Sequence, residues 1–337
     1  MVRLRVVYGI SILLSVLSGC GKHSGYFPSK LEPVDVTVER VDNALINVRA
    51  DSALVDIRAL YDSYPDFMLV FVEDVLGVPS TDTAFLCQAL PEFLNDTVYG
   101  FKATNAREQE LFQSVNDIEQ SLGKAFARVL YLYPDWVIPV IYLFVSGFNA
   151  SIVWVGDDIA VGTDLYLGSD YEYYNRVVHH YQKQTMRKEC IPADVISAYL
   201  FRHLPYTSRQ ARLIDQMLYR GKIMYLLSLC FPKLPGYEVM GYTQDQWKWA
   251  EEHEQDIWNM LMDHKDLFKY DNITLASFLN DGPFTAEISQ QCPARIGTWI
   301  GWQIAASYMH TNPTATLQSL MAEGDSQWIL ENSGYKP

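Results

Sequence analysis

The hydrophobic pattern changes in the middle of the chain, and this change limits the fold more strongly than any other feature of the sequence. Three runs between residues 138 and 168 are rich in β-branched and aromatic residues, with Gly, Asn and Asp between them: "IPVIYLFVSG", "ASIVWVG" and "DIAVGTDLYLG". Such runs predict strands, and the short connections predict a small antiparallel meander. Residues 34–42 alternate apolar and polar side chains, which predicts a further edge strand.

Helical patterns lie on both sides of this predicted sheet. Before it, two short apolar stretches end at Pro or Gly, and one long amphipathic helix is expected over residues 105–134. After it, helices are expected over residues 194–204, 209–232, 244–264 and 293–310. Because helices precede and follow one short sheet, the predicted class is α+β, mostly helical with a small antiparallel sheet. We expect a single domain over residues 34–337, with a helical part at 34–135, the sheet at 138–168 and a second helical part at 190–337.

Two glycines mark the helix expected over residues 293–310 as central. Gly297 and Gly301 lie one turn apart, in a segment with apolar residues on every face. Small side chains at that spacing allow a second backbone to approach closely. We therefore expect this helix to be buried in the middle of the helical part.

The N-terminus has the features of a bacterial lipoprotein signal. Arg3 and Arg5 precede an apolar run over residues 6–19, which is too short to span a bilayer comfortably. The run ends in Leu-Ser-Gly before Cys20, the pattern in which the cysteine receives the lipid. We expect residues 1–19 to be removed, and residues 20–33 to form the lipid anchor and a flexible tether. An ordinary secretory signal with a chance cysteine is the alternative.

The net charge of the chain limits the classes of partner that it can bind. Removal of Arg3 and Arg5 with the signal changes the net charge from −14 to −16, because residues 1–19 contain no acid. This balance argues against nucleic acid and anionic lipid headgroups as partners.

Four further cysteines allow three disulfide pairings, although their surroundings favour free thiols: Cys87, Cys190, Cys230 and Cys292.

The pair His253-Glu254 resembles the start of the zinc-peptidase motif H-E-x-x-H, but the motif is incomplete. The second histidine would stand at position 257, which is Ile257. His264 lies about 16 Å further along a helix, too far to share one ion. Glu254 instead falls in the middle of an apolar stripe. We expect a buried carboxylate with a Tyr, Arg or backbone N–H partner, with a ligand-binding role as the alternative.

No other catalytic pattern is complete. The chain has neither a G-x-S-x-G elbow nor a Gly-rich phosphate loop. His179 and His180 are adjacent, so their side chains point in different directions and cannot chelate one ion. Asp157 and Asp158 fall in a predicted hairpin turn, where Asp is expected for turn formation alone. We expect neither a metal site nor a cofactor.

Several longer segments carry a resemblance to a known family. They are "YPDWVIPVIYLFVSGFNASIVWVGDDIAVGTDLYLGSDYEYY", "LIDQMLYRGKIMYLL", "GYTQDQWKWAEEHEQDIW", "FLNDGPFTAEISQQCPARIGTWIGWQIAASYM" and "ILENSGYKP". Together with Cys20, they resemble the GldB-like gliding-motility lipoproteins of Bacteroidetes over nearly the whole mature chain. The resemblance implies a role in gliding or its associated envelope machinery, and no defined biochemical activity comes with it.

The same family is remotely similar to zincin-type peptidases, in which a small sheet is followed by a metal-binding helix and a second helix with a Glu ligand. By that analogy the first helix is residues 194–204, which has a lone His203, and the second has Arg220 where an acid is expected. The resemblance therefore implies a catalytically degenerate zincin-like architecture. The candidate cleft residues are Asp164, Tyr166, Tyr199, His203, Asp215, Tyr219, Arg220, Glu254, Arg295 and Trp302.

These observations favour a non-catalytic accessory or interaction component of the cell envelope. The alternatives are an envelope hydrolase with an unrecognised site and a small-ligand-binding lipoprotein. The expected partners are the membrane, through the lipid, and other envelope proteins, and no nucleic acid. The anchor belongs in the cell membrane or outer membrane. The stretch "CGKHSGYF" has no acidic run, which favours the periplasmic side.

Overall fold

The computed structural model describes residues 25–79, 82–95, 101–206 and 211–337. The predicted signal peptide and Cys20 lie outside these residues. Within the described ranges, no helix has both the length and the apolar character needed to cross a membrane.

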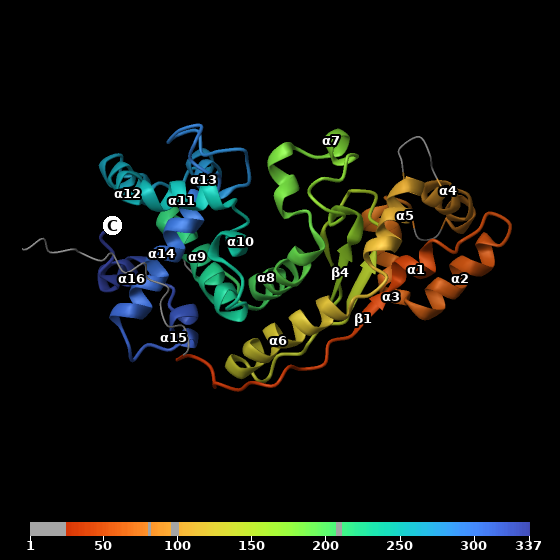
Figure 1. The fold of residues 1–337 in the computed structure, drawn as a ribbon, viewed down its shortest axis with the longest axis horizontal. Helices are drawn as coiled ribbons and strands as arrows, with labels where there is room; N and C mark the ends of the chain where they lie inside the picture. The colour runs from red at the N-terminus through yellow and green to blue at the C-terminus, as the bar shows by residue number, and fades with distance from the viewer. Residues whose placement is uncertain (1–24, 80–81, 96–100, 207–210) are drawn as a thin grey trace, which may run out of the picture.

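The molecule is long, with helices at both ends and a sheet between them (Figure 1). The N-terminal elements are β1 (Val38–Arg40), α1 (Val41–Leu45), α2 (Ala53–Ser63), α3 (Pro65–Val70), a π-helical turn at Phe71–Val75, α4 (Thr83–Asn95), α5 (Phe101–Leu111) and α6 (Asn116–Leu132). The sheet is completed by β2 (Ile141–Phe144), β3 (Ile152–Val155) and β4 (Asp158–Gly162).

The second helical part follows the sheet. It consists of 3-10 turns at Thr163–Leu165, His180–Thr185, Lys188–Cys190 and Asp266–Phe268, and of the helices α7 (Tyr174–Val177), α8 (Ile191–His203), α9 (Leu213–Cys230), α10 (Gly236–Met240), α11 (Gln244–Glu252), α12 (Glu254–Asp263), α13 (Asn272–Leu279), α14 (Ile296–Thr311), α15 (Leu317–Ala322) and α16 (Ser326–Ser333).

The sheet is mixed, so the prediction of an antiparallel meander was wrong. Its strand order is β1-β2-β4-β3, with β1 and β4 both parallel to β2, and only β3 antiparallel to β4. The expected edge position of the strand near residue 38 is confirmed. The tight turn at Gly156 and Asp157 joins β3 to β4, and this hairpin places β4, not β3, beside β2.

Both faces of the sheet are covered, which explains the parallel pairing. Ile141, Leu143, Ile159 and Val161 belong to the large core that includes α6, α8, α9 and α14. The alternate residues Phe144, Val155 and Ala160 belong to a second core, formed with α1 to α4. Strands buried on both faces are continuously apolar, as in "VIYLFV", and are typical of parallel sheets with helices on each side.

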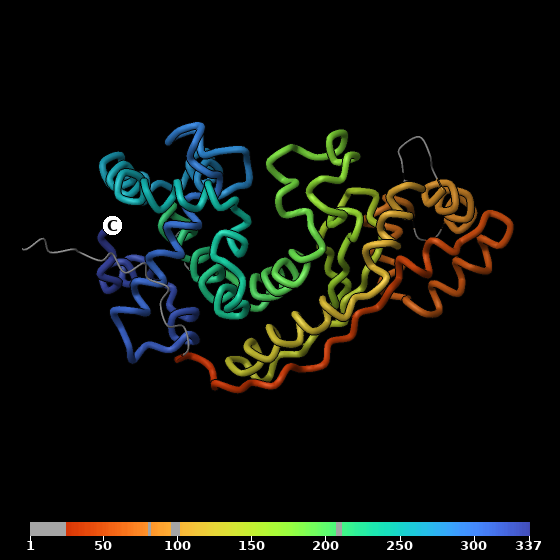
Figure 2. The backbone as a smooth tube through the Cα atoms, viewed as in Figure 1, coloured from red at the N-terminus to blue at the C-terminus, as the bar shows by residue number. Residues whose placement is uncertain are grey.

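The chain before β1 lies along α6, as Figure 2 shows. The Val34 N–H donates to the Gly123 carbonyl over 3.1 Å, and the Phe27 ring packs edge-on against Tyr131. Tyr26 reaches α9, where its hydroxyl lies 3.2 Å from that of Tyr225. The described part of the expected tether is therefore packed against the body of the protein.

Two helices that we expected to be continuous are interrupted. The first, over residues 105–134, breaks between α5 and α6, where Arg40 donates to the Phe112 carbonyl and Lys188 donates to the Ser114 carbonyl over 2.7 Å. These distant cations satisfy carbonyls that a continuous helix would pair internally. The second breaks at His253, whose Nδ1 lies 2.8 Å from the Trp249 carbonyl and whose ring stacks on Trp249.

The close crossing of α9 and α14 confirms the expected central helix. A Cβ at Gly301 would overlap the Met217 carbonyl of α9, and a Cβ at Gly221 would overlap the backbone of Gly301. A Cβ at Gly297 would lie 3.0 Å from the Phe278 carbonyl. The two helices can pack at this distance only because both positions at the crossing lack a side chain.

A buried ionisable cluster joins β1, α1 and α5. The Arg40 Nε donates to Asp42 over 2.8 Å, and Arg40 Nη2 lies 3.8 Å from Glu108 Oε1. Asp42 and Glu108 have no exposed surface. Burial and the adjacent Asp42 raise the pKa of Glu108 to about 9, against the lowering effects of Arg40 and Gln109.

Replacing Gly301 with Ala should destabilise the protein by about 3 kcal/mol or more, because α9 and α14 must separate to admit the new methyl group. Chemical denaturation would measure the loss. Gly282→Ala is the matched control, since its Cβ would meet nothing closer than 3.8 Å and its backbone needs no left-handed conformation. Equal stability of the two variants would contradict the crossing as described.

Replacing Glu108 with Gln should make the protein less sensitive to alkaline pH. Between about pH 4.5 and about pH 9, the folded protein retains a proton on Glu108 that the unfolded chain has released, so stability falls as the pH rises across this window. Relative to wild type, the variant should gain at least about 1.4 kcal/mol between pH 5 and pH 9 in urea denaturation. The exposed Glu110, on the same helix, provides the control Glu110→Gln. If Glu108→Gln changed the free energy of unfolding by the same amount at pH 5 and at pH 9, the prediction would be wrong.

Candidate functional site

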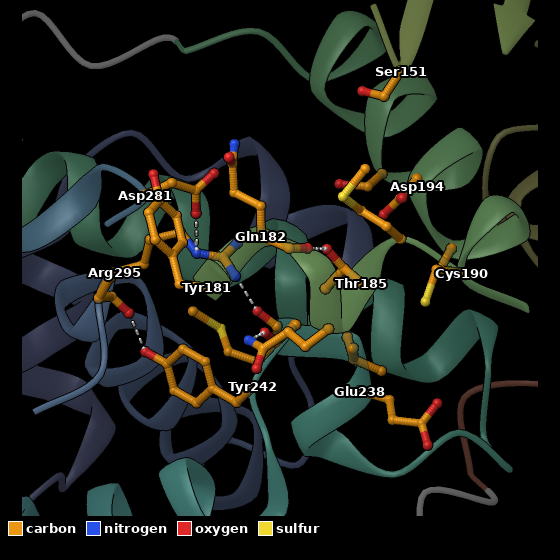
Figure 3. A pocket seen from close by; sticks show the side chains of 18 of the residues that line it. Ser151, Tyr181, Gln182, Thr185, Cys190, Asp194, Glu238, Tyr242, Asp281 and Arg295 are labelled. Carbon is orange, nitrogen blue, oxygen red and sulfur yellow. Dashed lines mark hydrogen bonds and ion pairs between the residues drawn. The ribbon is translucent and has the colours of Figure 1, made fainter. Parts of the chain in front are cut away.

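A cavity of about 340 Å³ lies between the sheet and the C-terminal helices, and we call it the main cavity. One wall comes from the segment after β4 and from the start of α8. The other comes from α9, α10, α11 and the loop before α14. Figure 3 shows polar side chains from both walls pointing toward the space between them.

Tyr166 and Asp194 form the wall on the α8 side. The Tyr166 hydroxyl donates to Asp194 Oδ2 over 2.8 Å, and Asp194 lies in the first turn of α8. Burial raises the pKa of Asp194 to about 6, although the hydrogen bond from Tyr166 and the charge of Arg295 lower it. Close to neutral pH, this carboxyl group therefore exchanges readily between its protonated and ionised forms.

Cys190 lies beside this pair and is unreactive at neutral pH. Burial, together with the negative charge of Asp194, raises the pKa of its thiol to about 11, although Arg187 lowers it. The thiolate is the nucleophilic form, and it is almost unpopulated at such a pKa.

Arg295 organises the opposite wall. Its Nε lies 2.8 Å from Asp281 Oδ1, and its Nη2 donates to the Met240 carbonyl. Its backbone is left-handed, with φ of 58°, at the residue that caps α14. Gly241 must also be glycine here, because a Cβ would lie 2.9 Å from Arg295 Nη2 and the backbone φ is +72°. Tyr242 donates to the Ala294 carbonyl over 2.6 Å and holds the same loop.

Acids outnumber bases in the wall of the main cavity. Its charged lining residues are Glu189, Asp194, Glu238, Asp281 and Arg295. Arg295 is occupied by Asp281, and Glu238 has Arg187 at 3.7 Å. No histidine is among the lining residues that the structure describes. The arrangement suits hydrogen bonding to a polar neutral or cationic molecule, and it disfavours a strongly anionic one.

A second, smaller cavity of about 180 Å³ lies where the end of α8 meets α9 and the segment between α15 and α16. His203, Asp215, Tyr219 and Lys222 are among its lining residues. The His203 Nδ1 lies 3.0 Å from the Tyr199 carbonyl, and the ring stacks on Tyr199 with centroids 4.0 Å apart. This cavity is separate from the main one, since the two share no lining residue.

The chain matches the sequence profile of the family described as "Gliding motility protein GldB" over residues 28–337. The chain belongs to this family. The resemblance inferred from the sequence is thereby confirmed. Searches of curated proteins and of solved structures gave no match, so the family assignment rests on the sequence profile.

The candidate cleft residues named from the sequence lie in several different places in the structure. Tyr166 and Arg295 line the main cavity, whereas His203, Asp215 and Tyr219 line the smaller one. Tyr199 lines neither cavity, and its ring stacks on that of His203.

Four selected residues have structural contacts outside both cavities. Asp164 is fully buried and accepts from the Ser146 N–H over 2.8 Å. Arg220 donates to the Leu279 carbonyl over 2.8 Å. Glu254 accepts from the Tyr335 hydroxyl over 2.8 Å, which is the kind of partner expected for it. Trp302 packs edge-on against Trp247, with ring centroids 5.5 Å apart.

Asp194, Glu238 and Asp281 were missed because each follows an ordinary local pattern. Asp194 is an acid in the first turn of a helix that has Pro192 near its start, which is typical of helix ends in general. The unusual local feature is the polar run "QKQT" at residues 182–185, which precedes Asp194 in a segment that is otherwise rich in helices. Among the residues that the structure describes, no three or more His, Cys, Asp or Glu side chains are grouped so that they could hold a metal ion. All four described cysteines are free thiols.

Replacing Tyr166 with Phe should raise the pKa of Asp194 above its value of about 6, because the hydrogen bond that stabilises the ionised form is lost. An NMR titration of ¹³C-labelled aspartate carboxyl groups would measure the shift. Tyr181→Phe, in the wall of the same cavity, is the control and should leave that titration unchanged. An unchanged or lowered pKa in Tyr166→Phe would contradict the proposed role of the hydroxyl.

Proposed function

We propose that this chain is a lipid-anchored, periplasm-facing protein that acts as a non-catalytic accessory component of the envelope machinery linked to gliding motility. The observation that carries the proposal is the family match over residues 28–337. The pattern that ends at Cys20 supports the anchor, because it contains the small residues and the cysteine that lipoprotein processing requires.

The chemistry of the main cavity supports binding over catalysis. Its described wall contains no histidine that could serve as the base for a Ser or Cys nucleophile. Cys190 is a neutral thiol, and Arg295 and Asp281 neutralise each other at 2.8 Å. Such a wall provides a fixed shape with hydrogen bonds, which is what recognition of a partner segment or a small polar molecule requires.

We further propose that the sheet, α8 and α9 represent a zincin-like arrangement without its metal site. In support, α8 packs against β3, β4 and α9, in the chain order expected from the analogy. Where a peptidase would have ligands, His203 contacts the Tyr199 carbonyl and Arg220 donates to Leu279. A partly buried guanidinium at that place opposes binding of a cation.

A second candidate is an envelope hydrolase that acts on peptide or glycan, and Asp194 is the observation in its favour. A carboxyl group with a pKa of about 6 suits a general acid near neutral pH. Glu189 and Glu238 line the same cavity and provide further carboxylates.

Crosslinking in intact envelopes would test the first proposal against the second. The tagged chain, its Asp194→Asn variant and an unrelated lipoprotein with the same tag would be expressed in the parent bacterium. We expect one or more envelope proteins to enrich with the wild type and equally with Asp194→Asn, relative to the unrelated lipoprotein. Cys20→Ser should abolish recovery of the chain with the membrane.

The contrary outcomes are distinct. If no envelope protein enriches above the unrelated lipoprotein, the interaction role is wrong. If purified wild type releases fragments from isolated peptidoglycan and Asp194→Asn does not, the chain is an enzyme. Equimolar zinc in the purified protein would contradict the non-catalytic zincin-like proposal.

A further inference from the structure

The smaller cavity contains a buried ammonium group that the family assignment does not explain. Lys222 has only 6% of its surface exposed, and its Nζ donates to the Glu323 carbonyl over 2.8 Å. In the described residues, no carboxylate oxygen lies within 4 Å of this nitrogen. An ammonium has three N–H donors and a full positive charge. One neutral carbonyl therefore satisfies only part of its hydrogen-bonding capacity and does not balance its charge.

The acids nearby are already engaged. Asp215 is 1% exposed and accepts from Arg212 Nε over 2.9 Å and from Nη2 over 3.0 Å, so its charge is neutralised within that pair. The Glu323 carboxylate accepts from the Asp325 N–H over 2.8 Å. Burial lowers the pKa of Lys222 to about 8, and Glu323 only partly offsets this. Lys222 is nevertheless mainly protonated at pH 7.

Tyr133, which also lines this cavity, has a polar atom without a partner among the described residues. The Tyr133 hydroxyl is buried and makes no hydrogen bond to any group that the structure describes. His203 uses its Nδ1 on the Tyr199 carbonyl, which can only accept, so the proton is on Nδ1. Lys222 and Tyr133 thus place two hydrogen-bond donors among the lining residues of one cavity.

Three tyrosines contribute aromatic surface to this cavity, beside the apolar side chains of Leu204, Pro205 and Met321. Tyr133, Tyr206 and Tyr219 line the cavity, and Trp136 stacks on Tyr133 with ring centroids 4.1 Å apart. A volume of about 180 Å³ is slightly larger than the roughly 150 Å³ of an engineered cavity that accepts benzene. The space therefore fits a small molecule with a flat apolar body and one acidic group.

We propose that this cavity binds a small monocarboxylate with an aromatic or similarly apolar body, with its carboxylate held by Lys222 Nζ and the Tyr133 hydroxyl. The carboxylate would supply an acceptor for each of these two donors and a second negative charge near the Lys222 ammonium, in addition to Glu323. Charge-assisted hydrogen bonds of this kind are stronger than neutral ones, and the low polarity of the site increases their strength. The site is independent of the main cavity and of the proposed envelope role.

Benzoate is a suitable probe, and benzamide is its neutral counterpart of the same shape. Isothermal titration calorimetry on the full chain in detergent should detect benzoate binding, with benzamide weaker by about tenfold or more. Lys222→Met should weaken benzoate by about tenfold or more, and Tyr133→Phe by several fold. In ¹³C-methylated protein, benzoate should raise the pKa of Lys222, because a carboxylate favours the ammonium form.

Two controls separate this site from general effects. The exposed Lys233 provides Lys233→Met, and Asp194→Asn alters only the main cavity, so both should bind benzoate like the wild type. The proposal is overturned if benzoate does not bind at concentrations up to about 10 mM, if benzamide binds equally well, or if Lys222→Met retains the affinity. Should Lys222→Met fail to fold, the comparison of benzoate with benzamide and the Tyr133→Phe variant decide.

Discussion

Where α9 crosses α14, Gly221 and Gly301 bring the two backbones together with no room for a Cβ between them. Both cavities depend on this contact. Helix α9 contributes Met224 and Leu227 to the main cavity, and Tyr219 and Lys222 to the smaller one. The start of α14 holds Arg295 in its left-handed conformation. A wider separation of the two helices would displace walls of both cavities at once.

The helical part was predictable because its signals are local. Gly297 and Gly301 in an apolar segment indicated a central helix, and Pro192 marked the start of α8. The sheet was predicted only in part, because strand pairing depends on residues far apart in sequence. The continuous apolar run before Ser146 indicates burial on both faces, but the position of β4 beside β2 follows from a hairpin that no local pattern orders.

Long-range contacts also explain why the candidate site was only partly predicted. The partner of Glu254 is Tyr335, and that of Asp194 is Tyr166, so each pair joins segments with no common sequence pattern. The interruption at His253 is different, because it is local: the His253 ring stacks on Trp249, four residues earlier. The sequence contains 22 Tyr and 8 Trp residues, and no local pattern indicates which of them surround a cavity.

The parallel pairing of β1 with β2 has a consequence for how the chain matures. Arg40 pairs with Leu143, about 100 residues later, and helices α1 to α6 all lie within that connection. The apolar faces of α1 to α4 are covered by Phe144, Val155 and Ala160, which a ribosome releases only after all four helices. The N-terminal third is therefore synthesised before its own core is complete. Pairing over such a separation is slow, so those helices must remain unaggregated until the sheet residues are available.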